Sequence, residues 1–408
     1  MTNFVNKNRF NSVIMNGLIS CIIIFITANV FWIGFSWIFS SIYEIILGST
    51  LDTFSASTQA SLILNGVEGA FFWLIIIPWI WMALNFGNIG KYDKGFKQPW
   101  VGIRYVLRCM CWGLVGFLII TLFLGLWWKP FNLGILLRPA TEAEALLAIK
   151  GWGAINFFAL ASILGQIPPV SLFAKWPFST LSKDAKVVGL GNFFLTLTIA
   201  LLIWIAFIIP SFLDPIEFAG QAITHQAAGT WGAGLAWAQV FVFFILIPAE
   251  GGEGYPQALF TKKQPWSGIV GLLISLIAAF AVTPLLRSLL AGYSDFVGLD
   301  PNIMTASFAL SIINVLLTWH HLFNDYPTKD MLTGGKRILA QLAIVLFIGV
   351  ILGFLWPLIY PYLPIGGNDL GLGIPVLGVI AGHFVYMLPM VFMNTGFDKW
   401  PVNQNEQN

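Results

Sequence analysis

Long apolar segments recur along the whole chain and are separated by short loops that contain Lys, Gly and Pro. Residues 22–33, 115–127 and 195–209 are parts of such segments. The full segments are of membrane-spanning length, which is about 20 residues for a helix. Charged residues make up 9% of the sequence, whereas roughly a quarter is usual in a soluble protein. The chain is therefore predicted to be an all-α integral membrane protein.

The apolar segments predict ten transmembrane helices in a single polytopic domain covering residues 1–408. Their approximate ranges are 13–42, 62–86, 100–127, 148–173, 186–212, 231–249, 266–291, 304–323, 334–360 and 373–395. With these spans, 16 of the 20 Lys and Arg residues fall on one side, and only Lys129, Arg138, Lys150 and Arg287 fall on the other. Because positive residues collect on the cytoplasmic side, both termini are expected in the cytoplasm, and the protein in a plasma (inner) membrane.

Several other classes do not fit the composition. The first apolar segment is too long for the core of a signal peptide, so we expect a retained first span. The 3 cysteines, Cys21, Cys109 and Cys111, all fall in apolar segments, which argues against an extracellular disulfide framework. A net charge of +2 gives no basis for nucleic-acid binding, and the chain has no phosphate-loop motif.

An aromatic residue followed by proline comes after four of the apolar segments. The sequences are AKWP at 174–177, EGYP at 253–256, NDYP at 324–327 and DKWP at 398–401, spaced by roughly 70 to 80 residues. The tetrapeptide KQPW opens both the third and the seventh span. These matches predict five pseudo-repeated helical hairpins in one orientation, with the fifth split across the termini. Alternatively, aromatic, proline and lysine residues are simply typical of membrane-interface loops.

Polar residues occupy matching positions before the aromatic-proline pairs. Six or seven residues before the proline lie Ser171, Glu250, His320 or His321, and Asn394 or Thr395, while Asn85 falls near the same level in the first unit. If the five hairpins close into a ring, these side chains are expected to form one layer that binds a substrate or an ion. The alternative is that polar residues collect wherever helices leave the bilayer.

The two adjacent histidines differ by about 100° around a helix, so only one is expected to face this layer. Alignment with Glu250 favours His321. Metal binding by His321 with Glu250, Glu253 or Asp325 is one option, but the spacing matches no helical metal motif, and no metal is assigned. Glycines around Glu250 predict that the sixth span unwinds there, and two carboxylates in that stretch favour a cation or a proton relay.

Three further ionisable residues are predicted inside the membrane. His383 lies near the middle of the tenth span, where it is expected on a transport path or, alternatively, bonded as a neutral ring to a neighbouring helix. Bis-histidine haem is not expected, because no second helical histidine lies at matching depth and His225 falls in an outer loop. Glu68 should face protein, paired with Arg287 or Lys150 or carrying a proton. Arg108, about 12 Å inside the third span, is expected to pair with Glu250 or Glu253.

These features favour a channel or transporter for a small solute or ion, with a path along the pseudo-symmetry axis past His383 and the Glu250–His321 layer. In helix count and expected symmetry alone, the chain resembles the plant slow-anion-channel and bacterial tellurite-resistance family. Two alternatives stay open. One is an enzyme acting on a lipid or quinone at the cytoplasmic interface, with His321, Glu250 and Asp325 as acid and base. The other is a non-catalytic subunit of a homo-oligomer or larger membrane complex. The sequence specifies no substrate and no cofactor.

Overall fold

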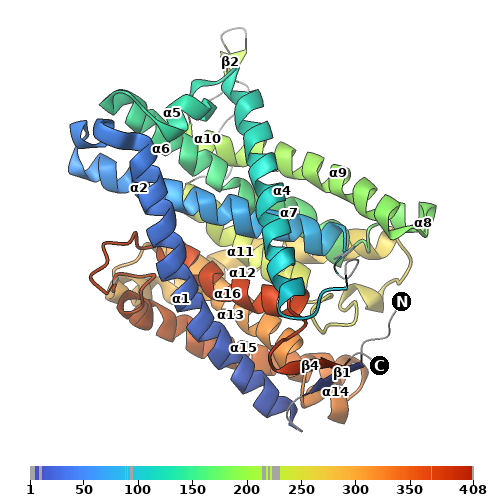
Figure 1. Ribbon diagram of the computed structural model, residues 1–408. Helices are drawn as coiled ribbons and strands as arrows, with labels where there is room; N and C mark the ends of the chain where they lie inside the picture. Colours follow the sequence, from blue (N-terminus) through green and yellow to red (C-terminus); the bar gives the residue numbers. More distant parts are fainter. Residues whose placement is uncertain are drawn as a thin grey trace.

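The computed structural model describes the chain except for residues 1–4, 9–11, 88, 90, 92–94, 214–216, 219–220, 223–229, 369 and 407–408. The described chain is almost entirely helical (Figure 1). Eight of its helices are long and apolar enough to cross a membrane, and two shorter apolar helices accompany them. The structure thus agrees with the prediction of an α-helical membrane protein.

Five helical segments are the more buried ones and form the interior. They are α2 (Ala56–Phe71) with its continuations η2 (Phe72–Ile76), α3 (Ile77–Trp79) and η3 (Ile80–Asn85); α6 (Glu142–Asn156) with α7 (Phe158–Ser171); α11 (Trp231–Leu246); α13 (Pro301–Phe323); and α16 (Val379–Thr395). In the three that are long enough to span a membrane, between 56% and 72% of the most apolar stretch is buried. We call these the inner helices.

Five other helices pack around the inner ones. They are α1 (Val13–Leu47); α4 (Trp100–Gly125); α9 (Ala185–Ile203) with η5 (Trp204–Ile208) and α10 (Ile209–Phe212); α12 (Trp266–Val297); and α15 (Gly334–Ile359). Only 17% to 28% of their most apolar stretches is buried. Helices that are apolar on all sides yet largely exposed are expected where lipid is the solvent, and we call these the outer helices.

Short elements connect the long helices. They are η1 (Gly48–Thr53), η4 (Lys129–Phe131), α5 (Leu133–Leu137), α8 (Phe178–Leu181), η6 (Gln257–Leu259), α14 (Thr328–Met331), η7 (Tyr360–Tyr362) and the paired strands β2 (Glu217–Phe218) and β3 (Gln221–Ala222). Strands β1 (Val5–Asn8) and β4 (Asn403–Glu406) pair antiparallel, so the two ends of the chain lie side by side (Figure 1).

Local sequence signals set several helix ends. Thr141 is the N-cap of α6, because its Oγ1 accepts a hydrogen bond from the backbone N–H of Glu144. The predicted start of the tenth span at residue 373 is too early, since α16 begins at Val379. Gly371 and Gly373 have φ of 75° and 66°, left-handed values that are incompatible with a continuous α-helix.

The four aromatic-proline sites share one backbone turn. In each, the residue two positions before the proline donates its N–H to the carbonyl six residues earlier, at 2.7 to 3.2 Å. These donors, which are Lys175, Gly254, Asp325 and Lys399, have φ between 59° and 78°. The residue before each donor has φ between 49° and 51°. The same turn therefore ends α7, α13 and α16 and follows α11, which places the preceding side chains in equivalent positions.

The two KQPW segments also make equivalent contacts. Each glutamine accepts a hydrogen bond from the N–H of the glycine four residues later, at 3.2 Å for Gln98 and 3.3 Å for Gln264. Each side chain also donates to a carbonyl just after an inner helix, to Gly396 from Gln98 and to Leu172 from Gln264. The first turns of α4 and α12 are therefore fastened to inner helices in the same way.

Candidate functional site

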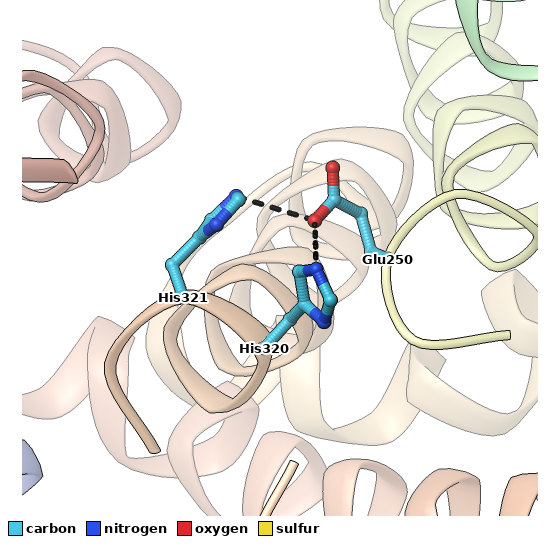
Figure 2. A group of neighbouring side chains, drawn as sticks. All are labelled: Glu250, His320 and His321. Carbon is cyan, nitrogen blue, oxygen red and sulfur yellow. Dashed lines mark ion pairs between the residues drawn. The ribbon is translucent and has the colours of Figure 1, made fainter. Parts of the chain in front are cut away.

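Glu250 and two histidines form a cluster where α11 and α13 end. His320 and His321 lie in the last turn of α13, and Glu250 lies in the turn that follows α11. Figure 2 shows both rings turned toward one carboxylate oxygen: Glu250 Oε2 is 3.2 Å from His321 Nε2 and 3.7 Å from His320 Nε2. The three ligand atoms lie within 4.8 Å of one another. We call these residues the His-Glu cluster.

The expectation that only one of the adjacent histidines can face a common point is wrong. Their Cα–Cβ bonds differ by about 100°, but Glu250 approaches between the two directions, and both side chains rotate toward it (Figure 2). The two ring centroids are 5.1 Å apart, and the ring planes are inclined by 64°. The choice of side-chain rotamers, which the helical angle alone does not specify, therefore decides this geometry.

Asp325 holds His320 from the other side of its ring. The two carboxylate oxygens of Asp325 lie 3.1 and 3.0 Å from His320 Nδ1, which donates its proton to them. The Asp325 side chain is only 3% exposed and also accepts hydrogen bonds from Gln341 at 2.7 Å and from Arg337 at 3.4 Å. With the proton of the neutral ring on Nδ1, the Nε2 of His320 presents a lone pair toward Glu250.

Asn394 contacts the equivalent ring nitrogen of His321, but as a donor and not as an acceptor. The amide Nδ2 of Asn394 lies 3.1 Å from His321 Nδ1 and donates a hydrogen bond to it. Asn394 belongs to the last turn of α16, so three of the inner helices contribute to the surroundings of the cluster. His320 and His321 remain 31% and 23% exposed, so solvent reaches both rings although Glu250 and Asp325 are largely buried.

The electrostatics of the cluster leave one atom unsatisfied. Burial raises the pKa of the Glu250 carboxyl above its ordinary value; Asp325 adds to the shift, and His320 opposes it. Glu250 Oε2 is buried and has no hydrogen-bond partner among the described residues. A buried carboxylate oxygen without a donor is costly, so this atom is a place where a proton or a metal cation would be stabilised.

Charged side chains near the cluster have partners of their own. Glu253, which was predicted to pair with Arg108, forms its ion pair with Arg337 on α15. Arg337 also contacts Asp325, at 3.4 Å. Lys399 donates to Asn324 Oδ1 at 2.9 Å, and burial lowers the pKa of this lysine. The negative charges of Glu253 and Asp325 are thus partly neutralised by one arginine, whereas no Lys or Arg among the described residues forms an ion pair with Glu250.

Asn85 and Ser171 lie apart from the cluster. Asn85 ends η3 and is fully buried; its Oδ1 accepts from Asn192 at 2.6 Å, and its Nδ2 donates to Gln166 at 3.1 Å. The Ser171 hydroxyl donates to a carbonyl of its own helix at 2.9 Å. Closer groups satisfy the hydrogen bonds of both side chains, and among the described contacts neither is bonded to Glu250, His320 or His321, so the shared polar layer stays a prediction.

His383 is hydrogen-bonded to a neighbouring helix, which was the alternative to a place on a transport path. Its Nε2 lies 3.0 Å from Ser307 Oγ, and its Nδ1 lies 3.3 Å from Asn314 Nδ2. The ring packs against Trp356 at a centroid distance of 4.6 Å and is 3% exposed. It borders a groove of about 810 Å³ between α1, α13, α15 and α16. His225, the histidine of the predicted outer loop, lies outside the described residues.

A cavity of about 220 Å³ borders the middle of the α2–η3 and α6–α7 segments and the first halves of α11, α13 and α16. All five inner helices line it, with Glu68, Asn156, Gln239, Ile303 and Phe384 each coming from a different one. Along α13, the distance from the cavity to the His-Glu cluster is about 26 Å at 1.5 Å per residue. The inner helices therefore border two separate sites at different levels along their length.

Three side chains with polar oxygen atoms, Glu68, Asn156 and Gln239, line this cavity, and the first two have oxygens without a described partner. Within the described chain, Glu68 has no ion pair or hydrogen bond through its side chain, and its predicted partner Arg287 donates to Asn302 at 3.4 Å. Asn156 Nδ2 donates to a backbone carbonyl of α2, while its Oδ1 is buried without a partner in the described residues. Oxygen atoms that lack donors favour a cation or a molecule with N–H or O–H groups.

Sequence reasoning missed His320 as a cluster member and Gln341 and Arg337 as its support. Gln341 and Arg337 lie four residues apart on α15, so they share one helix face. A polar pair at that spacing on an otherwise apolar helix is a signal that the sequence contains. Which carboxylate the pair meets is set by the packing of α15 against α13, and no sequence pattern carries that information.

Comparison with known protein families, with curated proteins and with solved structures finds no significant match to this chain.

Proposed function

We propose that the protein is a membrane channel or transporter for a small solute or ion, with a path along the axis of a ring of five helical hairpins. In this proposal the ten helices all cross a plasma (inner) membrane, with both termini in the cytoplasm. The two short helices α11 and α16 have 16 and 17 residues, about 24 to 26 Å, and cross with the help of the turns that flank them. Parallel repeats around an axis normal to the membrane are a known architecture of transporters.

Contacts between successive inner helices support ring closure. Lys175 Nζ donates to the carbonyl of Asn85 at 2.9 Å, which joins the turn after α7 to the end of η3. Lys399 joins the turn after α16 to that after α13 by its bond to Asn324. Lys91 Nζ donates to the carbonyl of Thr395 at 2.6 Å, and so links the segment after η3 to the last turn of α16. The first and last inner helices thereby become neighbours.

The cavity that all five inner helices share is the observation that carries the proposal. Helices whose only role is to pack together would fill such a space with apolar side chains, because an empty void loses dispersion contacts. Here the space contains Glu68, and a carboxyl group inside a membrane domain without a partner is costly unless it binds something. A small cation, or a proton, is the solute class that this carboxyl group favours.

Reconstitution into liposomes tests the proposal. Fluxes of NH4⁺, Na⁺, K⁺ and H⁺ would be followed with a dye inside the vesicles, and glycerol uptake would be followed by swelling. We expect flux of at least one of these solutes above that of protein-free vesicles. Glu68→Gln should reduce a cation flux at least tenfold, whereas Glu44→Gln, the same change at an exposed position of α1, should leave it unchanged.

A second variant keeps the experiment decisive if Glu68→Gln folds poorly. Ala159 is 4% exposed and lines the cavity, so Ala159→Phe would place a ring in the path. Folding would be checked by gel filtration and melting temperature. Absence of flux for every solute with folded wild-type protein, or fluxes that neither variant changes, would reject a path through this cavity.

An enzyme acting at the membrane interface is the second candidate function. The His-Glu cluster favours it, because two imidazoles and a buried carboxyl group within reach of solvent suit acid–base or metal-assisted chemistry. Loss of hydrolytic or redox activity on quinone or phospholipid substrates in His321→Ala, with flux unchanged, would favour this candidate over transport.

A further inference from the structure

We propose that Glu250, His320 and His321 bind one divalent first-row transition-metal ion, with Zn²⁺ as the reference case, through Glu250 Oε2 and the Nε2 atoms of both rings. This inference does not depend on the proposed path through the cavity, none of whose lining residues belongs to the His-Glu cluster. Two imidazoles and one carboxylate are a common ligand set for zinc and for non-haem iron.

The distances between the ligand atoms fit a metal centre. Zn–N and Zn–O bonds of about 2.0 to 2.1 Å at a tetrahedral angle put neighbouring ligand atoms roughly 3.3 to 3.5 Å apart. The observed separations from Glu250 Oε2 are 3.2 Å to His321 and 3.7 Å to His320 (Figure 2). Both are within about 0.5 Å of the tetrahedral values, and the two Nε2 atoms lie within 4.8 Å of each other, so rotations of the side chains would complete the coordination.

The outer contacts of both histidines match what metal ligands require. A histidine ligand is normally oriented by a hydrogen bond at its other ring nitrogen, commonly to a carboxylate, a carbonyl or a water. His320 Nδ1 has Asp325 within 3.0 Å, and Asp325 is itself fixed by Gln341 and Arg337. His321 Nδ1 has the Asn394 amide at 3.1 Å, and turning that amide over would offer it an oxygen acceptor instead. With the amide in that second orientation, both rings carry their proton on Nδ1 and present the Nε2 lone pair to the same point.

The unsatisfied oxygen of Glu250 is the second, independent observation. Among the described residues, no donor reaches this buried atom with hydrogen-bond geometry, although it lies between two ring nitrogens. A hydrogen-bonded cluster without a metal would be expected to place at least one N–H along the line to that oxygen. A cation between the three atoms would satisfy the oxygen and both nitrogens at once.

Charge and access further define the ion. Arg337 forms ion pairs with Glu253 and Asp325. Glu250 is therefore the carboxylate of this group that is left for a metal. Mixed nitrogen and oxygen ligands disfavour Ca²⁺ and Mg²⁺, which prefer oxygen alone. Because three protein atoms leave at least one coordination position open and the rings are partly exposed, a bound metal would also hold a water molecule or a substrate atom.

Metal titration of the purified full-length protein in detergent tests this inference. After treatment with a chelator and its removal, Co²⁺ and Zn²⁺ would be titrated, with Co²⁺ absorption reporting the geometry and elemental analysis reporting the stoichiometry. We expect one ion per chain with tetrahedral or five-coordinate Co²⁺ spectra and at least 100-fold tighter binding than for Mg²⁺. Glu250→Gln, His320→Ala and His321→Ala should each weaken binding at least 100-fold.

Matched variants separate the ligands from their surroundings. Asp325→Asn should weaken binding about 10- to 100-fold, since it changes a residue that orients a ligand. Glu253→Gln alters a carboxylate in the same loop that is paired with Arg337, so binding should stay within about fivefold. If ligand variants fold poorly, a rise in the melting temperature of the wild type with Zn²⁺, and its absence with Mg²⁺, provides a second measurement. No saturable binding, or binding that survives the changes in all three ligands, would overturn the inference.

Discussion

The ion pair between Lys91 and Asp398 offers a sharp test of ring closure, because it joins the segment after η3 to the turn after α16. Lys91 Nζ lies 2.6 Å from Asp398 Oδ1, and the two side chains are only 7% and 21% exposed. We therefore predict strong energetic coupling between two residues that are 307 positions apart in the sequence. The variants are Lys91→Met, Asp398→Asn and the double substitution.

The expected magnitude follows from the distance and the burial. With an effective dielectric constant of about 20, the Coulomb attraction at this distance is at most about 6 kcal/mol. Burial nevertheless lowers the pKa of Lys91 more than Asp398 raises it, so desolvation offsets the attraction. Removing one partner leaves the other charge buried, which should cost about 3 to 5 kcal/mol. The double variant should lose no more than the worse single variant, because neither charge is then left alone.

Unfolding by SDS titration in mixed micelles, followed by tryptophan fluorescence, gives the free energies for this cycle. Lys97→Met is the matched control, because Lys97 is exposed, and its effect should stay within about 0.5 kcal/mol. Additive losses, with a coupling below about 0.5 kcal/mol, would mean that the two side chains do not meet. That result would remove the contact that makes the first and last inner helices neighbours.

Three further predictions concern packing, hydrogen bonding and pH. Gly113→Ala on α4 should lower the free energy of unfolding by about 3 kcal/mol or more, since its Cβ would lie 1.7 Å from a carbonyl oxygen of η2. Gly34→Ala on α1 meets nothing within 4 Å, so it should raise that free energy by up to about 1 kcal/mol in the same SDS titration. Trp204→Phe should lose about 1 to 3 kcal/mol, because the buried indole donates to a carbonyl of α6 at 2.7 Å, and Trp237→Phe, whose buried N–H has no partner among the described residues, should lose less. Burial lowers the pKa of Lys175 below its ordinary 10.5, so the unfolded chain holds this proton to higher pH than the folded chain does. The free energy of unfolding should therefore rise with pH in the window just below 10.5. Lys175→Met should flatten that rise.

The sequence contains the signals for the membrane class and for the register of the turns. Few charges and long apolar segments leave lipid as the only solvent that can surround most of the chain, whatever the packing. The aromatic-proline pairs mark turns with the same backbone conformation: the residue three positions before each proline has φ between 49° and 51°. Glu250 and His321 precede two of these turns at equivalent positions. Backbone conformation of this kind is local, so a short sequence specifies it.

Side-chain direction is less local, and there the sequence is insufficient. His320 and His321 are separated by about 100° on a helical wheel, yet both reach Glu250, because the carboxylate arrives between them from another helix. Asn85, by contrast, is hydrogen-bonded to Gln166 and Asn192 of the next hairpin and makes no described hydrogen bond to the cluster. Which of several polar groups meet depends on interhelical distances and rotamers, and neither has a signature in the one-dimensional pattern.

The amino-acid sequence by itself determined that this chain forms long apolar helices joined by basic turns, because burial of backbone polar groups and exclusion of charge from lipid permit little else. Only the tertiary structure decided which helices are inner and which are outer, since all of them are apolar on every side. Only the tertiary structure brought Glu68 to a cavity shared by five helices and Asp325 behind His320. Those placements depend on close packing between segments that are distant in the chain, which is the level at which both proposed sites arise.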